Sequence, residues 1–242
     1  MIRKDIQLIA ICVATAAAVA AYLFWASNGA REAVRKTPFH HEAKRIPGWL
    51  SISILGVCTF QIPPTMELQG GAYKKINDQF RQEFLQIEPS HDRVVAQPKG
   101  LNAFDRNALK LYSRVIVETQ RGKPGDYTAL DESLVLSKND LWKINQGMRD
   151  MVQKATTLET TKGMKLELLS WEPPHVVQVN GVDMLFYSYT RMGDLSSVLV
   201  RTYIVQNNDC MHTITVSYRQ TETNLWANDL DNVIETFQFT KR

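Results

Sequence analysis

Residues 175–191 read HVVQVNGVDMLFYSYTR, a pattern typical of two β-strands joined by a tight turn. The dipeptide Asn180-Gly181 is preferred in type I′ hairpin turns, because both turn positions need a positive φ. The residues on either side are rich in valine and aromatic side chains, which favour strands. We therefore predict an antiparallel hairpin with strands over 175–179 and 182–191.

The hairpin belongs to a longer series of predicted strands. One strand precedes it at 164–170, and two follow at 198–206 and 211–218, with turns at 192–194 and 207–209. Side chains alternate between the two faces of a strand. In the last strand one face carries His212, Ile214, Val216 and Tyr218, and the other carries Thr213, Thr215 and Ser217. This alternation predicts a β-meander.

Three more strands are predicted nearer the N-terminus. Residues 51–54 and 58–62 alternate with period two and are separated by Gly56, and residues 110–119 are rich in β-branched side chains. Pro63-Pro64 ends the second of these strands, because proline has no N–H to donate to a neighbouring strand.

Helices are predicted where apolar residues recur at helical spacing. The first covers 73–88, the second follows the N-cap Ser137, and the third begins near Thr221 or Thr223. The apolar stripe of the second helix indicates core packing and consists of Leu141, Ile144, Met148, Met151, Val152 and Ala155. The stripe of the third is Trp226, Leu230, Val233 and Phe237. The segment after Glu235 is expected to extend the edge of the sheet on which this helix packs. Residues 49–242 therefore predict one α+β domain, an antiparallel sheet flanked by helices.

Residues 6–25 read IQLIAICVATAAAVAAYLFW and contain no charged residue. A helix of this length spans about 30 Å, the thickness of the hydrocarbon core of a bilayer. Basic residues flank both ends of the run, and Tyr22 and Trp25 lie where an aromatic belt is expected. We predict a transmembrane helix over 6–25 within an anchor region 1–25, followed by a juxtamembrane connector over 26–48.

A cleaved signal peptide is the alternative interpretation of the same run. Cleavage needs small residues at the first and third positions before the cut, and Asn28 or Phe24 would occupy the third. A lipoprotein signal needs a small residue before Cys12, where Ile11 stands. Arg3-Lys4 directly before the run favours a signal-anchor, with the domain outside the cytoplasm on the periplasmic side of a bacterial inner membrane. The basic residues after the run favour the opposite orientation.

Two stretches of the domain resemble a known family. Residues 57–64 (VCTFQIPP) resemble the opening strand of PsbP-like and DcrB-like domains, and residues 229–239 (DLDNVIETFQF) resemble their last helix and short final strand. The resemblance implies a PsbP-like sandwich, an antiparallel sheet flanked by helices, used in envelope-associated accessory proteins without catalysis. It implies no binding site, and residues 70–136 have no counterpart.

The residues that could carry chemistry are scattered. The stretch from His41 to Arg45 begins like a zinc-protease helix, but Arg45 stands where the second histidine is needed, and His40-His41 is a weak metal pair. Gly70-Gly71 indicates a turn, and His175 and His212 are interpreted as structural. Glu67 is the acid to watch in a cleft, with an exposed turn as the alternative. We assign no catalytic, cofactor-binding or metal residues.

The cysteines and the charge narrow the function classes. Cys58 and Cys210 form either one disulfide or two buried thiols. The net charge is +3 without a basic cluster on the domain, so no nucleic-acid partner is expected. The favoured interpretation is a non-catalytic, membrane-tethered binding or accessory domain of the cell envelope. Its partner would be an unidentified protein or envelope component that contacts the open face of the sheet or a loop within 90–135. The alternative is a hydrolase with catalytic residues scattered in sequence.

Overall fold

A computed structural model describes residues 43–54, 56–85, 92–127, 138–161, 167–193 and 195–239. The predicted span 6–25 and the pair His40-His41 lie outside these residues. Within the described part of the chain, no helix combines the length and apolar character needed to cross a membrane.

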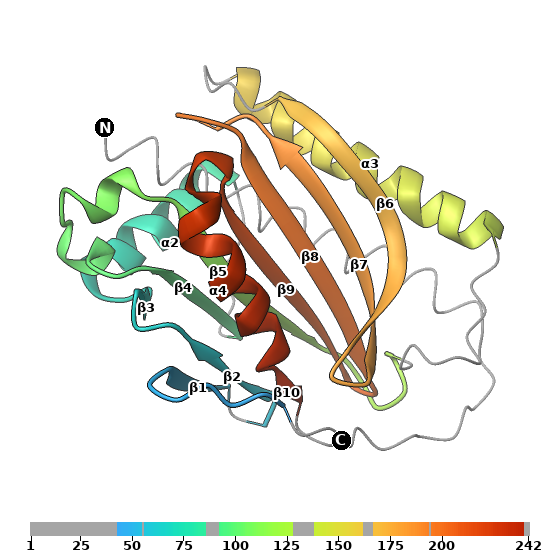
Figure 1. Ribbon diagram of the computed structural model, residues 1–242. Coiled ribbons are helices and arrows are strands. Elements are labelled where there is room, and N and C mark those ends of the chain that lie inside the picture. Colours follow the sequence, from blue (N-terminus) through green and yellow to red (C-terminus); the bar gives the residue numbers. More distant parts are fainter. Residues whose placement is uncertain are drawn as a thin grey trace.

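The domain is built on a seven-stranded antiparallel sheet, as the meander predicts (Figure 1). In spatial order its strands are β3 (Met66–Leu68), β4 (Arg93–Pro98), β5 (Ser113–Arg121), β9 (Cys210–Arg219), β8 (Val198–Asn207), β7 (Val182–Arg191) and β6 (Leu168–Val179). A second sheet has the order β1 (Leu50–Ile54), β2 (Cys58–Ile62) and β10 (Gln238–Phe239). The helices are α2 (Gly71–Leu85), α3 (Lys138–Thr161) and α4 (Thr223–Glu235). The α+β class with antiparallel sheets is confirmed.

The turns of the meander form where the sequence predicts them. Asn180 has φ 50° and Gly181 has φ 68°, the left-handed values that a type I′ turn needs. Asn208, in the turn between β8 and β9, has φ 59°. These turns fix the register, so that Leu185 pairs with Val176 on one side and with Ile204 on the other.

The prediction of two separate strands over 164–170 and 175–179 is wrong. One strand, β6, runs from Leu168 through Val179 and includes Pro173-Pro174, with register shifts between 168 and 170 and between 172 and 175. Prolines are tolerated here because β6 is the edge strand of the sheet, where one side needs no donor. The second shift reverses the face to which the following side chains point.

The segment after Glu235 does not extend the large sheet. It forms β10, which pairs with β2 through Gln238–Thr59 and Phe239–Cys58 in the three-stranded sheet. The ring of Phe237 stacks on that of Phe60 of β2 at 4.6 Å, and this contact places the residues that follow beside β2.

The large sheet has two different faces. The α4 face packs against α4 and the small sheet through residues that include Val115, Met184, Val205, Ile214 and Val216. The α3 face packs against Ile144, Met148 and Val152 of α3 through residues that include Ile116, Leu185, Tyr187, Tyr189 and Val200. In Figure 1, α4 crosses its face over β5 and β9, while α3 lies on the far side, behind β6.

Buried arginines hold one end of the α3 face together. The guanidinium carbons of Arg114, Arg191 and Arg219 lie 5.2, 5.9 and 5.8 Å from the centre of the Tyr112 ring. Arg219 pairs with Glu222 at 3.1 Å, and Glu222 also accepts the backbone N–H of Tyr112 at 3.0 Å. These bonds join the start of β5 to the end of β9 and to the entry of α4, so the cluster fixes where α4 begins.

The closing helix gives the first testable prediction. Trp226 and Phe237 are 1% and 2% exposed, whereas Asn228 is exposed on the opposite side of α4. Truncating a buried Trp or Phe to Ala typically costs about 3–5 kcal/mol. We expect Trp226→Ala and Phe237→Ala to lower the free energy of unfolding by this amount in denaturant melts. Asn228→Ala should change it by less than about 0.5 kcal/mol. Equal stability of all three variants would show that α4 does not hold the sheet.

Candidate functional site

The candidate site is the part of the α4 face that lies on β6, β7 and β8. We call it the open half-face, because in Figure 1 α4 crosses β5 and β9 and no described helix crosses these three strands on that side. Its residues are exposed at the β6 edge, at Glu172 and His175, and become buried towards α4, where Tyr203 is 8% exposed. It is defined by Glu172, His175, Phe186, Ser188, Arg201 and Tyr203. No motif in the sequence links these six residues, but the pairing of the strands places them in two rows across β6, β7 and β8.

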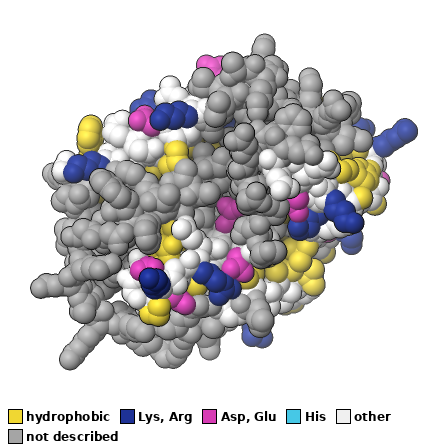
Figure 2. Space-filling model, turned by 180° about the vertical axis from the view of Figure 1, so that it is seen from behind, with side chains coloured by type: hydrophobic (Ala, Val, Ile, Leu, Met, Phe, Trp, Pro, Cys, Tyr) yellow, Lys and Arg dark blue, Asp and Glu magenta, His cyan; other side chains and the backbone are white. Residues whose placement is uncertain are grey.

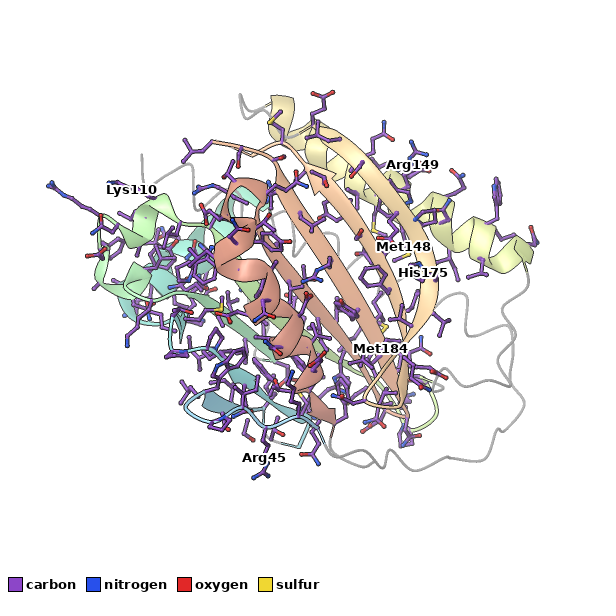
Figure 3. The ribbon with its side chains drawn as sticks, in the orientation of Figure 1. Arg45, Lys110, Met148, Arg149, His175 and Met184 are labelled. Atoms are coloured by element: carbon purple, nitrogen blue, oxygen red, sulfur yellow. The ribbon has the colours of Figure 1, made fainter. Side chains whose placement is uncertain are left out.

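The first row is aromatic. His175 pairs with Phe186, and Phe186 pairs with Tyr203, across β6, β7 and β8. The ring centres of His175 and Phe186 are 5.2 Å apart and edge-on, and those of Phe186 and Tyr203 are 4.9 Å apart and tilted. Such geometries are favourable for aromatic pairs. His175, labelled in Figure 3, lies at the β6 end with 48% of its side chain exposed, so the row leads from the sheet edge towards α4.

The second row is polar. Glu172 pairs with Ser188, and Ser188 pairs with Arg201 in the ladder. The hydroxyl of Ser188 donates to Oε2 of Glu172 at 2.5 Å. Arg201 forms an ion pair through Nη1 with Asp231 of α4. The row therefore connects the edge strand with the helix on the other side of the open half-face.

Two donor atoms of Arg201 have no acceptor among the residues that the structure describes. Its Nε and Nη2 atoms are buried and have no hydrogen-bond partner. Buried donors are normally satisfied, because leaving one unpaired costs roughly 1–3 kcal/mol and more for a charged group. The side chain of Arg201 is 18% exposed and that of its partner Asp231 is 56% exposed, so the pair lies at the border between α4 and solvent.

Tyr203 is a second donor in the same strand. Burial raises the pKa of its phenol above the ordinary value; Arg201 lowers it in part, while Asp231 and Glu172 raise it. The phenol is therefore protonated at neutral pH and can donate a hydrogen bond. On this strand the buried donors that lack an acceptor are therefore those of Arg201.

The arrangement does not form a catalytic triad. A serine nucleophile needs a histidine to take its proton, with the carboxylate behind the histidine. Here Ser188 bonds directly to Glu172, and Nε2 of His175 lies 4.0 Å from the other oxygen of that carboxylate. Nδ1 of His175 lies 3.0 Å from the carbonyl oxygen of Pro173.

The acid singled out by the sequence, Glu67, has a structural role. Its Oε1 accepts the backbone N–H of Asn102 at 2.7 Å, and the side chain of Asn102 bonds to the carbonyl of Leu68 at 2.7 Å and to the N–H of Gly70 at 2.9 Å. These bonds fasten β3 to the short 3-10 turn Leu101–Ala103. Gly71 begins α2 with φ 57°, in agreement with the predicted turn at Gly70-Gly71.

The structure does not bring the two strand histidines together. His175 lies on β6 and His212 on β9, with β7 and β8 between them. His212 is fully buried, lies 3.2 Å through Nδ1 from the Thr119 hydroxyl, and stacks on Phe239. Among the described residues, no group of three His, Cys, Asp or Glu side chains is placed to hold a metal ion.

The two cysteines of the domain do not form a disulfide with each other. Cys58 and Cys210 are both buried free thiols. Burial raises the pKa of the Cys58 thiol to about 12. A thiol that stays protonated is a poor nucleophile, so Cys58 acts as a small apolar side chain.

The chain matches solved structures at low sequence identity. No protein-family model and no curated protein matches the chain. A solved structure of a cyanobacterial PsbP protein, CyanoP of Synechocystis sp. PCC 6803, matches with 13% identity over 81% of this chain and 94% of that one, at a TM-score of 0.41. LpqN of Mycobacterium tuberculosis, described as involved in cell envelope biogenesis, matches with 11% identity over 79% of this chain and 90% of that one, at a TM-score of 0.36.

A third match is a protein of Bacteroides thetaiotaomicron VPI-5482, with 7% identity over 76% of this chain and 46% of that one, at a TM-score of 0.35. A PsbP protein is among these structural matches, and residues 57–64 and 229–239 of the chain resemble PsbP-like domains in sequence. All three TM-scores lie below 0.5, so the architecture described above rests on strand order and packing.

Proposed function

We propose that this protein is a non-catalytic, membrane-tethered binding domain of the cell envelope, which contacts its partner through the open half-face. The observation that carries the proposal is an aromatic row beside Arg201, whose buried Nε and Nη2 atoms have no hydrogen-bond partner, on strands that no described helix crosses in Figure 1. A surface that offers both apolar contact and unpaired donors gains from a partner that supplies apolar groups and acceptors.

The tether is supported by residues 6–25, which carry no charge and match the thickness of a bilayer. Arg3-Lys4 before this run is the arrangement of a signal-anchor, which would place the domain outside the cytoplasm. At the start of the domain, Lys44 bonds to Asn232 and Glu235 at 2.6 Å each, and the N–H of Ile46 bonds to Gln61 at 2.8 Å. The chain that leaves the predicted membrane helix is therefore fastened beside the C-terminal end of α4, on the side of the molecule that carries the small sheet.

The charge distribution supports a protein or envelope partner over a nucleic acid. In the view of Figure 2, the coloured basic and acidic side chains are interspersed among apolar ones and do not form one basic patch. Nucleic-acid affinity rests on clustered Lys and Arg that contact phosphates.

The first test concerns the tether. The full chain should fractionate with membranes, resist carbonate extraction and keep residues 6–25 at its mature N-terminus, because an apolar helix inserted in lipid is not released by alkali. A chain without residues 1–42 should be soluble and should melt cooperatively, since Lys44 and its bonds remain. A soluble mature species that begins near Arg31 would show that the run is cleaved and that the tether is absent.

The second test concerns the open half-face. A photo-crosslinking residue at position 175, on this surface, should form one discrete adduct in intact cells. The matched control is position 154, where Lys154 is also exposed but lies on α3, on the other side of the sheet. An adduct at 154 and none at 175 would place the partner on the opposite side and contradict the proposal.

A further inference from the structure

We propose that Asn180 is a site of spontaneous deamidation, and that this modification releases the turn between β6 and β7 from the C-terminal end of α4. Deamidation converts the side-chain amide of an asparagine to a carboxylate. It consumes water and needs no enzyme, so the residues around the turn decide whether it occurs and what it changes.

The side chain of Asn180 joins three segments of the domain. Its Nδ2 donates to the backbone carbonyl of Glu235 at 2.7 Å and to that of Phe237 at 3.2 Å. The same Glu235 carbonyl accepts the backbone N–H of Lys44 at 3.2 Å. The turn of the hairpin, the end of α4 and the start of the domain therefore meet at this amide, at the end of the molecule that carries β10 (Figure 1).

Asn180 caps the end of α4 from another part of the chain. The last carbonyls of a helix have no partner within the helix. Those of Val233 and Ile234 accept backbone N–H groups that follow the helix directly. The carbonyl of Glu235, the last residue of α4, accepts from Asn180 and Lys44. Both contacts of Nδ2 are carbonyl oxygens, so the amide nitrogen and not the amide oxygen fits there.

The dipeptide that the turn requires is also the one in which deamidation is easiest. Asn180 and Gly181 have φ 50° and 68°, and Asn-Gly suits both values. Glycine has no side chain, so its backbone nitrogen can approach Cγ of the preceding asparagine without hindrance. Gly181 is exposed and Asn180 is half-buried, so water reaches the turn. No other asparagine in the sequence of residues 43–239 precedes a glycine.

The reaction passes through a cyclic imide and is balanced by water. The backbone nitrogen of Gly181 attacks Cγ of Asn180, the N–Cγ bond forms, and the Cγ–Nδ2 bond breaks. The proton of the attacking nitrogen leaves with the side-chain nitrogen as ammonia. Water then adds to one of the two imide carbonyl carbons, that C–N bond breaks, and the ring nitrogen regains a proton. The product is aspartate or isoaspartate, and the extra backbone carbon of isoaspartate lengthens the turn.

The bonds of Nδ2 slow the reaction in the folded chain. Before Cγ can meet the nitrogen of Gly181, the side chain must leave the carbonyls of Glu235 and Phe237. The reaction therefore captures molecules in which the turn has opened locally. Because ammonia is lost, the turn cannot form its former bonds again, and the modified form accumulates with the age of the protein.

The product carboxylate disfavours the closed turn. An ionised carboxylate has no donor, so the two carbonyls lose their bonds and face a negative charge. The C-terminal end of a helix carries the negative end of its dipole, which repels this charge as well. The ammonium of Lys44 is already bonded to the side chains of Asn232 and Glu235 at 2.6 Å each. The modified turn therefore separates from α4 and β10.

The first experiment tests the modification. The purified full chain is kept in detergent at neutral pH in water enriched in heavy oxygen, then digested and mapped by mass spectrometry. The peptide that contains Asn180 should lose ammonia, gain one heavy oxygen atom and be recovered in part as isoaspartate. Mapping separates it from Asn28-Gly29, which lies outside the described residues. Gly181→Asn tolerates the left-handed turn but hinders the attacking nitrogen, and should slow conversion several-fold.

The second experiment tests the release by hydrogen exchange. Asn180→Asp reproduces the product, so the amides of β10 and of the last turn of α4 should exchange several-fold faster than in the parent. Asn180→Gly keeps the turn and removes the donor without adding charge, and should have a smaller effect. Asn228→Asp is the matched control, because it adds the same charge on the exposed side of α4, about two turns before Glu235.

The aged parent chain guards against a folding defect of the variant, because its modified fraction should show the same faster exchange. The modification is overturned if no converted peptide at position 180 forms in the folded chain while the chain unfolded in urea converts fully. The imide route is overturned if Gly181→Asn converts as fast as the parent. The release is overturned if Asn180→Asp and the aged chain exchange in β10 and α4 as Asn228→Asp does.

Discussion

The packing of one short helix on a wide sheet is the constraint on which the rest of the domain depends. Helix α4 has 13 residues, so it is about 20 Å long and about 10 Å wide. The sheet has seven strands, which span about 29 Å at a spacing of about 4.8 Å. Trp226, Leu230 and Val233 pack α4 into the core of this face, and the helix lies over β5 and β9 in Figure 1. Because one helix is narrower than the sheet, the small sheet completes the packing on the same face.

The alternation of side chains along β7 and β8 determines which of their residues lie on the open half-face. Tyr187 and Tyr189 point to the α3 face and are buried in its core, so Phe186 and Ser188 must point the other way. The register shift in β6 then brings Glu172 and His175 to the same side. Aromatic and charged residues thus meet on the strands that no described helix crosses in Figure 1, and Arg201 lies on the side of this surface nearest α4, where it pairs with Asp231.

Local signals in the sequence were sufficient for the hairpin at Asn180-Gly181, for α4 and for the stripe of α3. Each of these depends on residues within a few positions of one another. No local pattern indicates the pairing of β10 with β2, because it joins segments near the two ends of the domain and depends on the Phe60–Phe237 contact. The short strand β3 and the strand β4 lack a clear pattern of their own. The candidate site was missed for the same reason: Glu172, Ser188 and Arg201 meet only through strand register.

The exposure of side chains on the open half-face can be measured and compared with that of their neighbours on the same strand, β7. Hydroxyl-radical footprinting of the purified full chain reports how fast each side chain is oxidised. If the open half-face exists as described, Phe186 and His175 are oxidised readily, while Tyr187 and Tyr189, which are 1% exposed on the opposite face, react only after unfolding. Protection of Phe186 to the same degree as Tyr187, or rapid oxidation of both tyrosines, would contradict the account.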